Sequence, residues 1–218
     1  MTVYEIFSME HTLAAPLLEK CDKPWEALPQ IKEFILSLGP TLSKERYDEI
    51  SPTVWVAKSA KISKSAEILG PCIIGEESEV RPSAFIRGSV LIGRGAVIGN
   101  STEVKNSIIF DSVQIPHYNY VGDSILGYRS HMGAGAVTSN VKSDKSLVTV
   151  MMGGERIATG LKKFGAILGD SVEVGCNSVL CPGTVIGRNS TVYPLSRVRG
   201  FVPENSIFKS SENIVPKR

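Results

Sequence analysis

The sequence predicts a mainly β chain that winds as a parallel β-helix and is preceded by a short α-helical segment. Two patterns and the composition support this fold class. Aliphatic residues return every six positions over long stretches, and the residue two positions before each is usually small. The 218 residues include 20 Gly and 12 Pro and are 42% apolar but only 7% aromatic. A chain of this length can bury a sizeable core, and the scarcity of aromatics indicates a narrow, regular one.

The hexad repeat is the strongest of these observations. It comprises a first run of Val56, Ile62, Ile68, Ile74, Val80, Ile86, Ile92, Ile98 and Val104, and a second run of Leu168, Val174, Leu180, Ile186, Val192 and Val198. A helical period of 3.6 does not give this spacing, and neither does simple alternation. Short strands joined by tight corners do, because one aliphatic side chain per corner then stacks inside a solenoid. Glycine follows several of these residues, as at Gly75, Gly93 and Gly175, and we expect it to supply unusual backbone angles at corners.

Residues 1–51 lack the hexads and are predicted to form a helical N-terminal cap. Apolar residues recur at helical spacing after Pro24, and Gly39-Pro40 ends the pattern. Residues 43–50 favour a second short helix. We expect this cap to cover the open end of the solenoid, which otherwise exposes strand edges. A helix pair that docks a partner is the alternative.

The β-helix is expected to span residues 52–209, followed by a C-terminal tail at 210–218. The hexads stop between about 141 and 165, which predicts a loop extruded from the solenoid. Loops of this length are often functional, and this one holds Lys142, Lys145, Arg156 and Lys162-Lys163. It is predicted either to fold over an anionic ligand or to be a solvated insertion.

The charge balance and the cysteines limit which classes of partner and which cellular location are expected. A net charge of +2 without a basic run gives no indication of nucleic-acid binding. No stretch approaches the roughly 20 apolar residues of a membrane span, and we expect no signal peptide. The four cysteines lack zinc-ligand spacing, so reduced thiols, no structural metal and a cytoplasmic location are expected.

His117 stands out among three histidines because it lies where the hexads become irregular, between Pro116 and Tyr118. Most lone histidines are surface or core residues. In a repeat that favours small and aliphatic side chains, however, such a break in pattern indicates function.

Several motifs resemble the left-handed β-helix, hexapeptide-repeat acyltransferases, in which three hexads make one coil. The more specific resemblance is to the C-terminal acetyltransferase domain of bifunctional N-acetylglucosamine-1-phosphate uridyltransferase/glucosamine-1-phosphate acetyltransferases and to archaeal sugar-1-phosphate nucleotidylyltransferase/acetyltransferases. The motifs that carry it are Ile98-Gly99-Asn100, Glu103-Val104-Lys105, His117-x-x-Tyr120-Val121-Gly122-Asp123, Met132-Gly133-Ala134-Gly135 and Thr138-x-Asn140. The resemblance covers about residues 52–209, and we expect no counterpart of the family's nucleotidyltransferase domain among these residues.

This resemblance implies an N-acetyltransferase that uses acetyl-CoA as cosubstrate and an amino-sugar 1-phosphate as acceptor. His117 is then the general base, Asn140 the second catalytic residue, and Tyr120 and His131 contact the sugar. Imidazole suits the uptake of a proton near neutral pH. A thiolate leaves readily, so neither an enzyme nucleophile nor a metal is required.

The family also implies an arginine and a lysine one coil apart that bind the sugar phosphate. Lys105 has two candidate partners, Arg81 and Arg87. Arg87 lies three hexads before Lys105 and is expected to stack directly on it, about 4.8 Å away. Arg81 lies four hexads before and is expected on another face. The spacing therefore favours Arg87 with Lys105 as a joint phosphate site.

Acetyl-CoA is expected to contact Ala134, Lys145, Lys163, Cys176 and Lys209. Backbone N–H groups of Gly133–Gly135 would stabilise the tetrahedral oxyanion, and the lysines would meet the cofactor phosphates. The sequence departs from the family at three positions, with His131 in place of Asn, Val141 in place of Tyr and Cys176 in place of Ser. These departures bear on the acyl donor and on the amino sugar, which the sequence does not name.

Three other functions remain as alternatives. A zinc-dependent carbonic anhydrase on the same scaffold needs His-x4-His, but Gly122 stands five residues after His117. A non-catalytic or regulatory solenoid would not need His117 at all, and a sugar O-acetyltransferase would use a hydroxyl acceptor. The family resemblance also implies a homotrimer with each site between neighbouring copies, because a narrow solenoid has no internal cavity.

Overall fold

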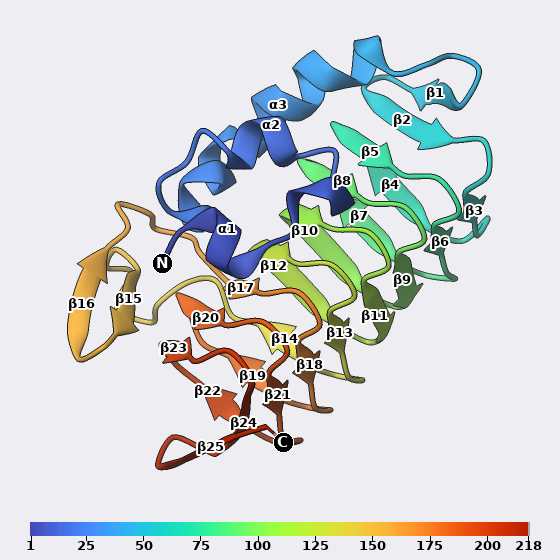
Figure 1. Cartoon of the computed structure of the whole chain (residues 1–218). Helices are drawn as coiled ribbons and strands as arrows, with labels where there is room; N and C mark the ends of the chain where they lie inside the picture. The colour runs from blue at the N-terminus through green and yellow to red at the C-terminus, as the bar shows by residue number, and fades with distance from the viewer. Residues whose placement is uncertain (218) are drawn as a thin grey trace.

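The computed structural model describes residues 1–217 and confirms the predicted fold class. The chain forms a left-handed parallel β-helix with helical turns at its N-terminus (Figure 1). The helical elements are α1 (Val3–Ile6), η1 (Met9–His11), α2 (Ala15–Leu18), η2 (Pro24–Gln30), α3 (Ile31–Leu38) and η3 (Gly39–Thr41), the η elements being 3-10 turns. In the described residues no helix is long and apolar enough to cross a membrane.

The strands are short, and most lie in the solenoid. They are β1 (Tyr47–Ser51), β2 (Val54–Ala57), β3 (Lys61–Ile62), β4 (Glu67–Leu69), β5 (Cys72–Ile74), β6 (Glu79–Val80), β7 (Phe85–Arg87), β8 (Val90–Ile92), β9 (Val97–Asn100), β10 (Glu103–Ile109), β11 (Gln114–His117), β12 (Tyr120–Leu126), β13 (His131–Met132), β14 (Val137–Thr138), β15 (Thr149–Met152), β16 (Glu155–Ala158), β17 (Ala166–Leu168), β18 (Glu173–Val174), β19 (Val179–Leu180), β20 (Thr184–Ile186), β21 (Thr191–Val192), β22 (Arg197–Val198), β23 (Phe201–Val202), β24 (Ser206–Ser210) and β25 (Asn213–Pro216).

The coils build three faces. The covered face contains β2, β5, β8, β17, β20, β23 and the second halves of β10 and β12. The open face contains β4, β7, β14, β19, β22 and the first halves of β10 and β12. The third face contains β3, β6, β9, β11, β13, β18, β21 and β24. Within each coil the chain passes from the covered face to the third face and then to the open face.

The strand register shows how regular the coils are. On the covered face Val54 pairs with Cys72, and Cys72 with Val90, which is a full coil of three hexads each time. Val90 then pairs with Ser107, and Ser107 with Ser124, so each of these coils is shorter by a single residue. The wobble of the hexads in the middle of the chain therefore reflects shortened coils.

The hexad aliphatics point inward, as the repeat predicts. Ile74, Ile92 and Ile98 are fully buried. The glycines that follow hexad residues, however, do not have the left-handed backbone angles expected of them, since positive φ at the corners falls mainly on Ser, Asn and other non-glycine residues. A Cβ on Gly93 would instead lie 2.5 Å from the backbone nitrogen of Asp111 in the next coil. Close coil-to-coil approach therefore requires glycine there.

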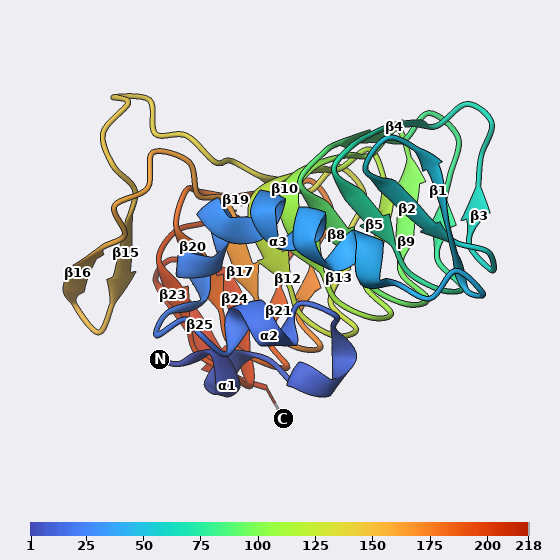
Figure 2. The ribbon, with the colours of Figure 1, turned by 90° about the horizontal axis from the view of Figure 1, so that it is seen from above.

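The helical segment lies lengthwise along the covered face, as Figure 2 shows, and this corrects the expectation that it closes the end of the solenoid. α3 packs against β8 and β10, and η2 against β12. The reason is an outward-facing apolar column on this face, in which Ile73, Leu91 and Ile125 are fully buried. The two ends are instead bordered by antiparallel pairs, β1 with β2 and β24 with β25, which reduces the exposed strand edges.

A segment is extruded from the solenoid between β14 and β17. Coils on either side of it still pair in parallel, as Ile125 does with Ile167, although the whole extruded segment lies between them in the sequence. Within it β15 and β16 form an antiparallel hairpin that projects from the solenoid (Figure 1). Val148 and Val150 at its base are fully buried, so the hairpin is anchored.

Candidate functional site

Arg87 and Lys105 occupy one column of the open face. Their strands pair in parallel, with Ile86 beside Val104, so the two cations lie on adjacent coils. Each has a carboxylate partner: Arg87 Nη1 lies 2.5 Å from a Glu103 oxygen, and Lys105 Nζ lies 3.6 Å from Asp123. The two cations of this column are therefore each paired with a carboxylate that lies beside the column.

Asp123 is the centre of a buried polar cluster at the corner between the open and covered faces. Its side chain is only 6% exposed. Its carboxylate accepts hydrogen bonds from the side-chain amides of Asn106, at 2.9 Å, and Asn140, at 2.5 Å. The same Asn140 amide donates to the Tyr120 hydroxyl at 3.2 Å. Asp123 thus links Lys105 to Asn140, and the Asn140 amide extends this link to Tyr120, which brings three predicted site residues together.

Gly122 makes this cluster possible. It pairs with Lys105 across the coils, and a Cβ on it would lie 2.5 Å from the Tyr120 hydroxyl oxygen and 2.9 Å from the Asn140 amide nitrogen. Burial, together with Asp123 and Glu103, raises the pKa of the Tyr120 phenol. Tyr120 therefore keeps its hydroxyl proton at neutral pH and can donate it to a ligand.

The N-terminal segment supports this corner from the covered face. The backbone oxygen of Leu28 in η2 accepts a hydrogen bond from the Asn106 side chain at 3.3 Å. The Trp25 ring packs at 5.9 Å between centroids against Phe164, whose N–H bonds to the backbone oxygen of Asn140. The helical segment thus braces the residues around Asp123.

His117 lies at the other edge of the open face, at the corner that leads in from the third face. Its side chain is exposed, and no described residue is paired with its ring. Its backbone is fixed, because its N–H donates to Asn119 Oδ1 and its oxygen accepts from Gly135. Within one chain, His117 and Asn140 therefore lie at opposite edges of the open face and do not meet.

A column of backbone contacts leads away from His117 along this corner, which we call the His117 corner. Gly135 N–H donates to the His117 oxygen, Asn177 N–H to the Ala134 oxygen, and Leu195 N–H to the Cys176 oxygen. Ala134 and the exposed Cys176 thus occupy the same corner in successive coils below His117. The structure brings these two expected cofactor residues together with the expected base.

His131 lies on the third face at the start of β13. It pairs with Gln114 on one side and with Glu173 on the other. Its ring Nδ1 lies 2.9 Å from a Glu173 carboxylate oxygen. Arg81 is also on this face, where it pairs with Glu79, so Arg81 is off the open face as the spacing predicts.

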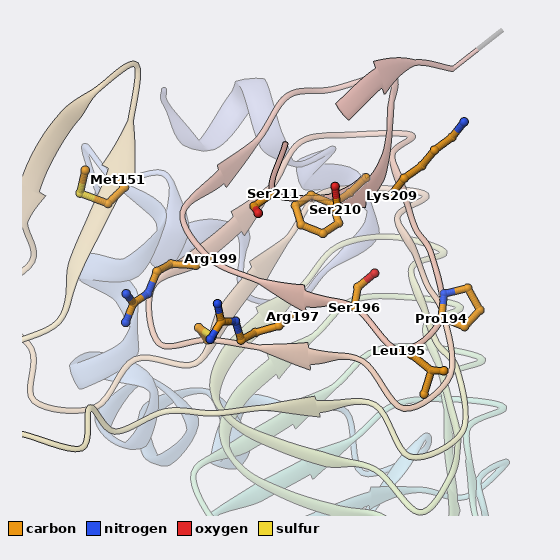
Figure 3. Close-up of a pocket in the computed structure, with 11 residues that line it drawn as sticks. Met151, Pro194, Leu195, Ser196, Arg197, Arg199, Lys209, Ser210 and Ser211 are labelled. Carbon is orange, nitrogen blue, oxygen red and sulfur yellow. The ribbon is translucent and has the colours of Figure 1, made fainter. Parts of the chain in front are cut away.

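A cavity of about 590 Å³ lies at the C-terminal end of the open face (Figure 3). Its lining residues are Met151, Cys181, Pro194, Leu195, Ser196, Arg197, Arg199, Phe208, Lys209, Ser210 and Ser211. Figure 3 shows Arg197 and Arg199 extending from one stretch of chain toward the strand that carries Met151, with Lys209 at the opposite rim. No carboxylate lines the cavity, and no ion pair within residues 1–217 involves these three cations.

The other two expected cofactor lysines lie elsewhere. Lys145 and Lys163 are exposed on the extruded segment, which leaves the solenoid at the corner near Asn140. They are therefore at the opposite edge of the open face from the His117 corner. The described residues also contain no group of three or more His, Cys, Asp or Glu side chains that could hold a metal ion.

Comparison with known proteins identifies the family. The profile of the GMPPB C-terminal domain matches residues 68–186. The chain belongs to this family. It is also 32% identical over 199 residues to the bifunctional protein GlmU of Methanococcus vannielii, a match that covers 90% of this chain and 48% of that protein.

Other relatives carry related descriptions. The chain is 35% identical over 166 residues to the bifunctional sugar-1-phosphate nucleotidylyltransferase/acetyltransferase of Sulfurisphaera tokodaii, covering 68% of this chain and 41% of that protein. It thus spans about half the length or less of these relatives. Among solved structures, PerB from Caulobacter crescentus, in complex with CoA and GDP-perosamine, superposes with a TM-score of 0.36 at 16% identity, covering 74% of this chain and 56% of that one.

The sequence alone did not identify several residues that contact the predicted site residues of this family member. Glu103, Asp123 and Glu173 are partners of predicted site residues, and each partner lies on a neighbouring coil or at its corner. Their pairing depends on the shortened coils and on the long sequence separation across the extrusion. Arg197 and Arg199 had a signal in the sequence, since they flank the inward hexad residue Val198 and are therefore expected to point outward.

Proposed function

We propose that this protein is an N-acetyltransferase that transfers the acetyl group of acetyl-CoA to the amino group of an amino-sugar 1-phosphate. The observation that carries the proposal is one continuous surface. The exposed His117 stands at a corner that continues through Ala134 and Cys176 to a cavity holding three cations without carboxylate partners. An extended thioester with phosphates at its far end fits this arrangement.

The cosubstrate phosphates would bind at the C-terminal cavity. Arg197, Arg199 and Lys209 present donors suited to phosphate oxygens, whereas Lys145 and Lys163 do not line this cavity. Lys209 lies 5.7 Å from the centre of the Tyr193 ring, which holds it at the rim. The pantetheine arm would then run along the His117 corner, crossing coils spaced about 4.8 Å apart.

The acceptor would bind on the open face. An amino-sugar 1-phosphate carries both an anionic phosphate and a cationic ammonium, and the ion pairs of Arg87 with Glu103 and of Lys105 with Asp123 likewise present both signs. A phosphate that binds Arg87 and Lys105 must compete with the carboxylates of Glu103 and Asp123 for these cations. Tyr120, whose raised pKa keeps its proton in place, would donate to the sugar, and Asn140 would orient the amine.

The chemistry needs one base and one oxyanion donor. His117 would take a proton from the ammonium, so that the amine can attack the thioester carbonyl. Among the three N–H groups around Ala134, those of Gly133 and Gly135 already donate to Val174 and His117. The Ala134 N–H has no acceptor in residues 1–217 and is therefore the one available to the oxyanion.

We also propose a homotrimer that acts in the cytoplasm. Val179 on the open face and Tyr118 and Leu195 at the His117 corner are exposed apolar side chains, which suits contact with a second copy. A neighbouring copy would close the distance between His117 and an Asn140. The four cysteines are free thiols, as expected in a reducing compartment.

The test is thiol release from acetyl-CoA with glucosamine-1-phosphate and galactosamine-1-phosphate. We expect wild type to release thiol with at least one of them, and His117→Ala to lower kcat about 100-fold or more. Sedimentation of the same samples should give a trimer. Release that depends on a sugar hydroxyl rather than an amine would assign an O-acetyltransferase.

A non-catalytic solenoid is the second candidate. It is favoured by one observation: both cations expected to bind phosphate are already paired with carboxylates. In that case neither acceptor supports thiol release and His117→Ala changes nothing measurable.

A further inference from the structure

The proposed reaction leaves one proton transfer without an assigned residue. A sugar amine that arrives as an ammonium has three N–H bonds, and the amide product has one. Two protons must therefore leave the nitrogen, of which one ends on the departing sulfur and one in water. His117 can accept only one of them in each turnover before it is discharged.

His131 is the second imidazole near this corner, and its surroundings differ from those of His117. Glu173 lies 2.9 Å from its Nδ1, and an ionised carboxylate can only accept a hydrogen bond. The contact therefore fixes Nδ1 as the protonated nitrogen of the neutral ring and leaves Nε2 as the proton acceptor. Nε2 has no hydrogen-bonding partner among residues 1–217, and the side chain is 37% exposed.

The two histidines occupy neighbouring strands of the third face. His117 ends β11, and Gln114 on that strand pairs with His131 on β13. The strands are about 4.8 Å apart, and three residues of roughly 3.3 Å each separate the two positions along the strand. Gly133 directly follows β13, and a Cβ on it would lie 2.7 Å from the backbone nitrogen of Cys176 in the next coil, so the residue that separates β13 from Ala134 carries no side chain.

The charged groups around His131 are few. β11 contributes His117 and no carboxylate or cation in register with it, and β18 contributes Glu173. Arg129, two residues before His131, is turned onto the Tyr128 ring at 5.0 Å. Glu173 is thus the charged group that His131 faces directly.

We propose that His131, oriented by Glu173, is the second proton acceptor of the acetyl-transfer reaction. His117 Nε2 or Nδ1 takes the first proton from the ammonium. The amine nitrogen then forms a bond to the thioester carbon as the C=O π pair moves to oxygen, and the adduct nitrogen gives its second proton to His131 Nε2. When the C=O bond reforms, the C–S bond breaks, and the sulfur takes the electron pair and this proton.

The proposal rests on the proposed function and is tested by pH–rate profiles of thiol release. In wild type, two groups must be unprotonated, so log kcat should fall toward low pH with a slope approaching two. His131→Asn should lower kcat about 10- to 100-fold, leave KM for both substrates within about twofold, and reduce the slope to one. Glu173→Gln keeps an acceptor but removes the charge, and should lower kcat about tenfold with unchanged KM.

Glu79→Gln is the matched control. It makes the same substitution in the same column of the third face, several coils earlier, at a carboxylate paired with Arg81, and should leave the profile unchanged. A wild-type slope of one, or full kcat in both His131→Asn and Glu173→Gln, overturns the proposal while the acetyltransferase stands. No thiol release by wild type overturns the proposed function and this inference with it.

Discussion

The covered and open faces are built from the same hexads and differ only in what their strands present outward. On the covered face, β5, β8 and β17 are buried at every residue, because the middle side chain of each faces the N-terminal helices. On the open face, β4 is exposed at both ends, and β7 alternates between a buried Ile86 and its exposed neighbour Arg87. A repeat fixes the inside of a solenoid, and the outward positions decide what each face does.

This difference assigns separate roles to the two faces. The interior is filled with stacked aliphatic side chains, so binding must occur on an outer surface. The covered face is occupied by the chain's own helices, which leaves the open face, the His117 corner and the adjoining part of the third face for ligands. Residues on the covered face should therefore affect stability, and residues on the open face should affect activity.

The largest expected effect separates two leucines on neighbouring faces. Leu91, fully buried under the helices, should lose about 3 kcal/mol of unfolding free energy on replacement by Ala. Leu69, 44% exposed on the open face, should lose about 0.5 kcal/mol or less. Urea unfolding of Leu91→Ala and Leu69→Ala measures both, and equal losses would contradict the division of the faces.

Asp123→Asn tests where the two faces meet. A carboxylate accepts from both Asn106 and Asn140, whereas an amide in its place turns its own NH2 toward one of these donors. We expect unfolding free energy to fall by about 1–3 kcal/mol and kcat to fall about tenfold, measured by urea unfolding and thiol release. Asp144→Asn, on the exposed part of the extrusion, should change neither, and an unaltered kcat in Asp123→Asn would remove this residue from the site.

Arg87→Lys tests the phosphate site on the open face alone. Lysine keeps the charge but lacks the planar fork that matches a phosphate. KM for the sugar phosphate should rise about tenfold, equivalent to about 1.4 kcal/mol, with kcat and stability little changed. Arg81→Lys, on the third face, is the control, and a larger effect there than at Arg87 would reassign the phosphate contact.

The smallest effect concerns thiol reactivity. Burial raises the pKa of the Cys72 thiol. At pH 8 this thiol therefore stays protonated, and it is also buried, so an alkylating reagent should not react with it. Exposed Cys176 at the His117 corner should react, and a non-reactive CoA analogue should slow that reaction severalfold. Mass spectrometry of the alkylated peptides reads both sites. Undiminished labelling of Cys176 with the analogue present would move the cosubstrate off this corner.

Much of the fold could be predicted because the inward hexads are set by local spacing. The position of the helical segment could not, although the all-apolar triplets Cys72–Ile74 and Val90–Ile92 held a signal for it. The first and last residues of each triplet are apolar because they face the interior of the solenoid. The middle residue faces outward, so its apolar character indicates that another segment of chain covers it. A prediction based only on the inward positions therefore places the helical segment at the end of the solenoid rather than along the covered face.

The candidate site divides in the same way. His117 is conspicuous within its own stretch of chain, and the pairing of Arg87 with Lys105 follows from a regular coil of three hexads. Asp123 contacts Asn140, at a separation in sequence that is set by a shortened coil. Glu173 contacts His131, at a separation that is set by the extruded segment between them. Such contacts arise from the three-dimensional register, which a fixed period does not predict.

The most direct test of the central claim is detection of the product amide. Acetyl-CoA labelled with ¹³C at the carbonyl is incubated with an amino-sugar 1-phosphate, and the carbonyl resonance is followed by NMR. The account predicts that wild type transfers the label to the sugar nitrogen, that His117→Ala does so at least about 100-fold more slowly, and that Ile50→Ala, at an exposed position in β1 outside the site, retains the wild-type rate. Label that remains on the thioester with wild type, or transfer by His117→Ala at the wild-type rate, would contradict it.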